Sequence, residues 1–216
     1  MKIFLDTADT DAIEKAYTTG IIDGVTTNPT LIRKSGRDPE EVYQQLIDYG
    51  INDISMEVVG DYNTMFEEGV RLSRKFGKAC TIKVPCTPDG LRVCRELSRD
   101  LVNVNVTLIF SAAQAILAAK SGAKYVSPFV GRVDDNSFNG IDLIEQISDI
   151  YTIQNVHKTE ILSASIRDVK SVSDSFASGA HVVTLPPAVF EKMYNHILTD
   201  KGLELFQADW ESVHNT

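Results

Sequence analysis

Short runs rich in β-branched and aromatic residues alternate with longer amphipathic stretches along the whole chain. The runs predicted as strands are Ile3–Asp6, Gly24–Asn28, Asp53–Val58, Thr81–Val84, Val102–Thr107, Lys124–Phe129, Glu160–Ser165 and His181–Leu185. The stretches with helical spacing are Thr10–Thr18, Pro39–Tyr49, Tyr62–Phe76, Pro88–Ser98, Ala112–Ser121, Ile141–Tyr151, Arg167–Ser178 and Ala188–His196. A repeated strand-then-helix order predicts a parallel sheet with helices packed outside it.

Eight strand–helix units favour a closed α/β barrel, the (β/α)8 TIM barrel, over an open doubly wound sheet. No glycine-rich nucleotide-binding motif follows any predicted strand. The segment Thr199–Trp210 comes after the eighth unit and predicts an additional C-terminal helix over about 199–212. We therefore expect one barrel domain over residues 1–216, with this helix packed on its own barrel or on a neighbouring subunit.

Polar and aliphatic residues alternate within the predicted strands. Asn103, Asn105 and Thr107 share one parity, while the two intervening residues are valines. The same alternation gives the polar set Asp6, Thr26, Asn28, Ser55, Glu57, Lys83, Ser127, Ser163 and Ser165. A polar barrel interior is costly unless its groups bond one another, water or a ligand. Because these residues gather near the carboxyl ends of the strands, we expect a binding or catalytic site there.

Lys83 lies inside the apolar run Thr81–Pro85, which predicts a buried amine. Burying a lone charge costs several kcal/mol, so a buried lysine usually has a partner or is neutral. A neutral amine attacks carbonyls, and this chemistry would need the carboxylates Asp6 and Glu57 close by. The alternative is a lysine at a strand end that reaches solvent or closes a structural ion pair.

The composition of the chain disfavours some classes of binding partner. The formal net charge is -9, which disfavours nucleic acids and anionic membranes. No run reaches the roughly 18 apolar residues of a spanning helix, and Asp6 interrupts the first apolar run too early for a signal peptide. Three cysteines without CxxC spacing and four scattered histidines predict no metal site and reduced thiols in the cytoplasm.

Five motifs carry a family resemblance. They are Phe4–Ala8, Thr26–Thr30, Ile82–Pro85, Asn105–Leu108 and Ser127–Arg132. Together they resemble the short transaldolases, a subfamily that includes the fructose-6-phosphate aldolases, in the superfamily of class I Schiff-base aldolases. The likeness runs over essentially the whole chain, with the motifs in order at the matching strand ends.

The resemblance implies a Schiff-base mechanism without metal or cofactor. Lys83 would attack the C2 ketone of fructose 6-phosphate or sedoheptulose 7-phosphate, and Asp6 would take the proton from the C4 hydroxyl. The dihydroxyacetone unit would pass to erythrose 4-phosphate or glyceraldehyde 3-phosphate, in the non-oxidative pentose phosphate pathway. By the same resemblance, Glu57 and Thr107 position a water that relays protons.

The remaining expected site residues bind the sugar phosphate. The resemblance assigns the hydroxyls of the three-carbon unit to Asn28 and Asn105, with Ser127 nearby. Arg132, Ser165 and Arg167 follow the sixth and seventh strands, where barrels commonly bind phosphate, and the resemblance assigns them the same role.

Three other functions stay open. A fructose-6-phosphate aldolase would release free dihydroxyacetone, but such enzymes typically carry tyrosine at the position of Phe129 and glutamine at that of Glu57. A deoxyribose-phosphate-type aldolase would act on acetaldehyde instead. A non-catalytic barrel would only bind sugar phosphates. The resemblance further implies a homo-oligomer, a pentamer or decamer, whose C-terminal helix reaches a neighbour.

Overall fold

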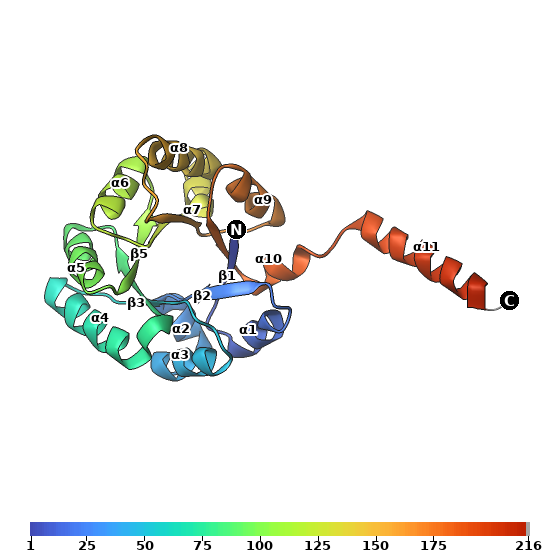
Figure 1. Cartoon of the computed structure of the whole chain (residues 1–216), viewed down its shortest axis with the longest axis horizontal. Coiled ribbons are helices and arrows are strands. Elements are labelled where there is room, and N and C mark those ends of the chain that lie inside the picture. Colours follow the sequence, from blue (N-terminus) through green and yellow to red (C-terminus); the bar gives the residue numbers. More distant parts are fainter. Residues whose placement is uncertain (215–216) are drawn as a thin grey trace.

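The computed structural model describes residues 1–214, and these form a closed barrel of eight parallel strands in chain order (Figure 1). The strands are β1 (Lys2–Asp6), β2 (Ile22–Thr26), β3 (Ile54–Glu57), β4 (Cys80–Pro85), β5 (Asn103–Ile109), β6 (Tyr125–Pro128), β7 (Glu160–Ser163) and β8 (Val182–Leu185). The predicted (β/α)8 TIM barrel is therefore confirmed. Residues 215–216 of the predicted domain lie outside the described residues.

Helices surround the ring of strands (Figure 1). They are α1 (Thr10–Tyr17), α2 (Pro29–Ser35), α3 (Pro39–Asp48), α4 (Tyr62–Phe76), the 3₁₀ helix η1 (Gly77–Ala79), α5 (Pro88–Arg99), α6 (Ala112–Lys120), α7 (Val130–Asp135), α8 (Gly140–Ile153), α9 (Val169–Ala177), α10 (Pro187–Lys192) and α11 (Ile197–His214). Side-chain caps explain several starts: Asp9, Asp38 and Thr87 each accept hydrogen bonds from the first turn of the helix that follows.

Two short α-helices were not predicted, and two predicted helices are shorter than expected. The predicted helix Arg167–Ser178 covers only Val169–Ala177. The predicted strand Gly24–Asn28 ends at Thr26, because Asn28 is the N-cap of α2. The predicted helix Ala188–His196 ends at Lys192, after which the backbone N–H groups bond carbonyls three residues back. The other unpredicted helix, α7, has only six residues and no side-chain cap.

The barrel has two apolar cores. Aliphatic residues on the outward faces of the strands, such as Ile82 and Val84, are fully buried against the helices. Inside the barrel a smaller cluster contains Phe4, Tyr125, Leu162, Ala164 and Val182. These residues fill the lower part of the lumen, so only its carboxyl end is left for polar groups.

The predicted parity was wrong for β7. Ser163 was expected to face the lumen, but its hydroxyl lies 2.8 Å from that of Ser175 on α9. Leu162 and Ala164 point inward instead and belong to the inner apolar cluster. The small residues of this strand fit either face, and the buried Ser163–Ser175 hydrogen bond satisfies the outward serine.

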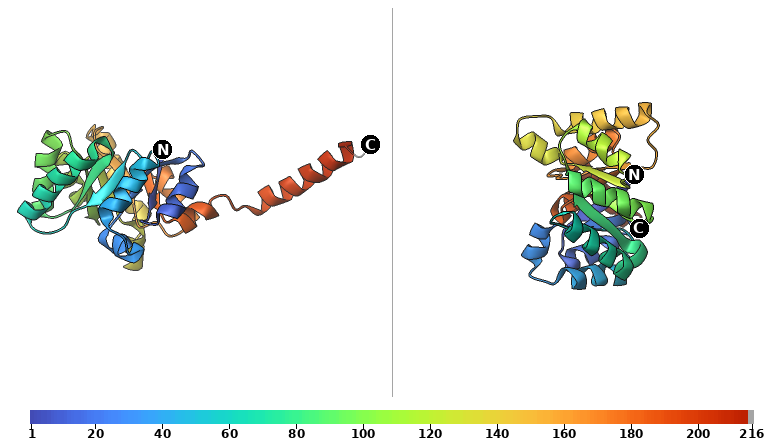
Figure 2. Two further views of the ribbon diagram at one scale, coloured as in Figure 1. Left: turned by 90° about the horizontal axis from the view of Figure 1, so that it is seen from below. Right: turned by 90° about the vertical axis from the view of Figure 1, so that its left-hand side faces the viewer.

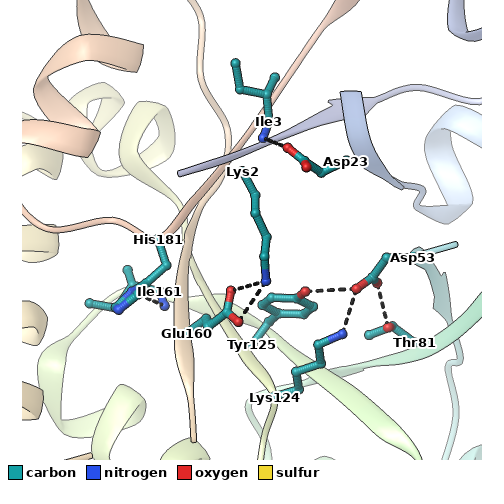
Figure 3. A network of polar contacts seen from close by, with 10 residues as sticks. All are labelled: Lys2, Ile3, Asp23, Asp53, Thr81, Lys124, Tyr125, Glu160, Ile161 and His181. Atoms are coloured by element: carbon teal, nitrogen blue, oxygen red, sulfur yellow. Dashed lines mark hydrogen bonds and ion pairs between the residues drawn. The ribbon is translucent and has the colours of Figure 1, made fainter. Parts of the chain in front are cut away.

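A network of charges closes the amino end of the barrel (Figure 3). Asp53 accepts hydrogen bonds from Thr81, Lys124 and Tyr125 at 2.7–2.8 Å. Beside it, the Lys2 ammonium bonds both carboxylate oxygens of Glu160 at 2.8 and 2.7 Å. Because Tyr125 and Phe4 are fully buried above this network, the lumen has no passage at its floor.

Helix α11 leaves the barrel and extends away from it (Figures 1 and 2). Its residues Leu203, Leu205 and Phe206 are 62%, 67% and 73% exposed. The predicted C-terminal helix is thus present, a few residues longer than 199–212. Within residues 1–214, no helix is long and apolar enough to cross a membrane.

Candidate active site

Lys83 projects from β4 into the barrel, and its side chain is only 6% exposed. Strand register places it beside Glu57 of β3 on one side and Asn105 of β5 on the other. The Lys83 Nζ atom lies 3.0 Å from Glu57 Oε2 and donates a hydrogen bond of 2.9 Å to the carbonyl oxygen of Thr27. The amine is therefore buried and held at a fixed position by two acceptors.

Asp6 ends β1 on the same inner surface. Its Oδ1 atom accepts a 2.8 Å hydrogen bond from the Thr26 hydroxyl, which also lies 2.7 Å from the hydroxyl of Thr184. Burial raises the pKa of Asp6 above its ordinary value of 3.8, against the opposing effects of Lys83, the Thr26 bond and Arg132. A carboxylate with a raised pKa is better suited to take up a proton near neutral pH.

A small cavity of about 90 Å³ joins these groups. Its lining residues are Asp6, Thr26, Asn28, Lys83, Thr107, Ser127, Phe129, Arg132, Ala164, Ser165 and Thr184. Most of the predicted site residues thus surround one space. Glu57 does not line the cavity and reaches it through its ion pair with Lys83.

A buried hydrogen-bonded chain runs from Ser127 in the cavity wall to Asn105 and Ser55 below it. The Ser127 hydroxyl donates to Asn105 Oδ1 at 2.7 Å, and Asn105 Nδ2 donates to the Ser55 hydroxyl at 3.2 Å. These bonds fix the orientation of the Asn105 amide. Asn105 itself lies beneath the surface of the cavity rather than in its lining.

Thr107 has a different character. The residue lines the cavity, and its buried hydroxyl oxygen has no hydrogen-bond partner among the described residues. An unsatisfied buried hydroxyl costs about 1–3 kcal/mol. Thr107 is thus prepared to bond a polar group that enters the cavity.

Asn28 serves both the fold and the site. Its Oδ1 atom accepts a 3.0 Å hydrogen bond from the backbone N–H of Leu31 and so caps α2. The residue also lines the cavity. Since the oxygen is engaged by the helix, the amide N–H groups are the donors that Asn28 can offer to a ligand.

The predicted phosphate ligands lie together at the rim of the barrel. Arg132 and Ser165 line the cavity, and the Arg132 guanidinium is 4.8 Å from the centre of the Phe129 ring. Ser165 has a left-handed backbone with φ of 60°, which is rare for a residue with a side chain. Arg167 does not line the cavity; its guanidinium donates to both carboxylate oxygens of Asp135.

The aromatic residue in the wall of the cavity is Phe129, and the ring of Phe110 packs behind it. Phe129 lines the cavity, and the Phe110 ring meets it edge-on with a centroid distance of 5.7 Å. Neither side chain has a hydroxyl, so this wall offers no proton donor.

Two features of the site were not predicted. Thr184 of β8 lines the cavity. Val182 faces the barrel interior, so alternation along β8 could have predicted that Thr184 does too. The Thr27 carbonyl that holds Lys83 gave no signal, because any residue can supply a backbone oxygen. No group of three or more His, Cys, Asp or Glu side chains within residues 1–214 could hold a metal ion.

Comparisons with known proteins identify the family of the chain. The family model described as Transaldolase/Fructose-6-phosphate aldolase matches residues 3–216. A protein named Probable transaldolase from Nitrosopumilus maritimus (strain SCM1) is 50% identical over 214 residues, covering 99% of this chain and 96% of the relative. Another of that name from Paracoccus denitrificans (strain Pd 1222) is 53% identical, covering 97% and 96%. The chain is therefore an enzyme that belongs to the transaldolase/fructose-6-phosphate aldolase family.

Proposed function

We propose that this enzyme transfers a dihydroxyacetone unit from a ketose phosphate to an aldose phosphate through a Schiff base on Lys83. The donor is fructose 6-phosphate or sedoheptulose 7-phosphate, and the acceptor is erythrose 4-phosphate or glyceraldehyde 3-phosphate. The observation that carries the proposal is the buried Lys83 amine, 3.0 Å from Glu57 and in one cavity with Asp6. The proposed place of this reaction is the non-oxidative pentose phosphate pathway.

The first step forms the Schiff base. Lys83 first passes a proton to its partner Glu57, and the free amine attacks the C2 ketone to give a carbinolamine, which then loses its hydroxyl as water. Carbinolamine formation moves one proton from nitrogen to the alkoxide oxygen, and the loss of water then needs one further proton on the leaving hydroxyl and leaves a protonated iminium. Glu57, in contact with Lys83, and the Thr107 hydroxyl in the cavity wall are suited to hold the water that relays these protons.

Carbon–carbon cleavage follows. Asp6 takes the proton of the C4 hydroxyl, the C3–C4 bond breaks, and its electron pair moves into the iminium. The aldose phosphate leaves, and an enamine stays on Lys83. An acceptor aldehyde then receives the enamine carbon, Asp6 returns its proton to the new hydroxyl, and water hydrolyses the Schiff base.

The ends of the substrate have distinct partners. Asn28 donates from its amide to a hydroxyl of the three-carbon unit, while Asn105 and Ser127 form the polar floor beneath it. Arg132 and Ser165 at the rim, with Arg167 behind them, hold the phosphate.

Reduction with borohydride tests the proposal. Incubation with fructose 6-phosphate and borohydride should label one lysine irreversibly, and peptide mapping should place the adduct on Lys83. Lys83→Met should abolish labelling, whereas Lys170→Met, at an exposed lysine of α9, should leave it unchanged. An adduct on another lysine would contradict the proposed mechanism. Complete absence of labelling would favour a non-catalytic sugar-phosphate-binding barrel.

A fructose-6-phosphate aldolase is the second candidate. It would release dihydroxyacetone after cleavage, and this requires a proton for the enamine. The aromatic wall at Phe129, with Phe110 behind it, lacks a donor, which favours transfer over release. Product analysis with and without acceptor separates the two, and acetaldehyde-dependent exchange would reveal a deoxyribose-phosphate-type aldolase.

We also propose that the protein is a homo-oligomer, a pentamer or decamer, and that it is cytoplasmic. The exposed apolar residues of α11 support packing of this helix on a neighbouring subunit, since a lone extended helix is marginal in water. The free thiols Cys80, Cys86 and Cys94 suit a reducing compartment. Light scattering of the whole chain measures the assembly.

A further inference from the structure

The Arg167 side chain packs against one face of helix α7. Gly131 and Asp135 lie four residues apart on α7 and therefore on the same face, one turn from each other. The Arg167 Nε atom passes so close to Gly131 that a Cβ atom there would be 2.8 Å from it. One turn further, both terminal nitrogens of Arg167 donate to the two carboxylate oxygens of Asp135.

Gly131 makes this arrangement fit. A Cβ atom at this position would lie 2.3 Å from the carbonyl oxygen of Ser165, closer than atoms can approach. Without one, the Gly131 N–H donates to that oxygen at 3.1 Å, next to a 3.0 Å bond from Val130 to Ala164. The first turn of α7 is thus tied to the segment after β7, which brings Arg132, Ser165 and Arg167 to one place.

The ion pair with Asp135 orients the Arg167 guanidinium and leaves some of its donors for a ligand. A guanidinium has five N–H donors in a planar fork, and Asp135 takes two of them through the terminal nitrogens. The Nε–H group and two further donors remain for an anion. The bond to Arg167 lowers the pKa of Asp135, with Arg132 contributing, so the carboxylate is ionised at neutral pH.

We propose that Asp135 is a positioning residue of the phosphate site, which sets the Arg167 guanidinium beside Arg132 and Ser165. This inference rests on the proposed function, because it takes the substrate phosphate as the anion. The opposite role is a carboxylate that competes with phosphate for Arg167. The two roles predict changes of opposite sign in phosphate affinity.

The test measures the dissociation constant of inorganic phosphate by ³¹P NMR titration and the KM for fructose 6-phosphate. Asp135→Ala should weaken both about fivefold through loss of this half-exposed charge-assisted pair, and Asp135→Glu should restore most of the loss. Borohydride trapping of unphosphorylated dihydroxyacetone on Lys83, and kcat, should stay within about twofold, since the change acts only on the phosphate. Asp174→Asn removes a partly exposed carboxylate that is likewise in an ion pair, with Lys170 on α9, and should change nothing.

Unchanged or tighter phosphate binding in Asp135→Ala would overturn the inference. A parallel loss of dihydroxyacetone trapping would also overturn it, because the role would then be general structure. If the wild-type enzyme traps no substrate but loses phosphate affinity on substitution of Asp135, the positioning role stands and the proposed function falls.

Discussion

Glu57 and Lys83 are register partners on adjacent strands, and their charged atoms lie 3.0 Å apart in a nearly dry part of the barrel. A buried ion pair adds little stability over an apolar pair, but removal of one partner leaves an isolated charge that costs about 3–5 kcal/mol. The pair therefore couples the chemistry of the site to the stability of the barrel.

Lys83→Met should lower the free energy of unfolding by about 3 kcal/mol, since it leaves the Glu57 carboxylate without its cation. The double variant Lys83→Met with Glu57→Gln should recover much of this loss, while both remain inactive. Urea denaturation gives the free energies. Equal stability of the single variant and the wild type would mean that water solvates Glu57 well enough to replace the pair.

Asp6→Asn should raise stability at neutral pH and lower activity. The folded-state pKa of Asp6 is raised, so the folded chain holds the proton more tightly than the unfolded chain. The stability contributed by Asp6 is fully present below its unfolded pKa and is lost as pH rises through the folded value. At neutral pH the asparagine variant should therefore have a higher Tm, with turnover reduced about 10²–10⁴-fold.

Melting curves from pH 7 down to pH 4 check the sign of this effect. The advantage of Asp6→Asn should shrink as the wild-type carboxyl group takes up its proton. A variant that is less stable at neutral pH would show that the ionised carboxylate is well stabilised by Lys83 and Thr26.

Substitutions of Asn28 should separate its two roles. Asn28→Asp keeps the oxygen that caps α2 at the Leu31 N–H, so stability should stay within about 0.5 kcal/mol of wild type. It loses the amide donors, and the KM for the donor ketose should rise. Asn28→Ala should lose about 1 kcal/mol in addition. Normal ketose affinity in Asn28→Asp would remove Asn28 from the substrate-binding residues.

Phe129→Tyr should raise the release of free dihydroxyacetone relative to transfer. A tyrosine hydroxyl at this wall of the cavity would supply the proton donor that Phe129 lacks. The ratio of dihydroxyacetone to transfer product measures the effect, with Phe110→Tyr on the neighbouring ring as a control. A ratio unchanged from wild type would show that the wall does not govern the fate of the enamine.

The barrel was predictable because its signals are periodic. Eight strand-like runs alternate with amphipathic stretches, and Lys83 stands out within an apolar run. Parity succeeded where large aliphatic residues alternate with polar ones, as around Asn105. It failed at Ser163, because serine and alanine are small enough for either face and the outward hydroxyl finds Ser175.

Non-periodic features were harder to predict. The α7 helix is a single short segment between β6 and α8, and its propensity signal is weak. In the sequence, Asp135 is one of two adjacent acidic residues with nothing to set it apart. Its role becomes visible only in the structure, where Arg167 passes Gly131 and bonds Asp135. Alternation assigned Ser165 to the inner face, but β7 has the opposite parity, and Ser165 lines the cavity from a left-handed backbone conformation after the strand.

The filled amino end of the barrel lumen has a kinetic consequence. Since Phe4 and Tyr125 fill the lumen beneath a cavity of about 90 Å³, a substrate reaches Lys83 from the carboxyl end of the barrel. In the proposed transfer reaction, the departing aldose must therefore leave before the acceptor can reach Lys83. Double-reciprocal plots at several acceptor concentrations should accordingly be parallel, the signature of a ping-pong exchange.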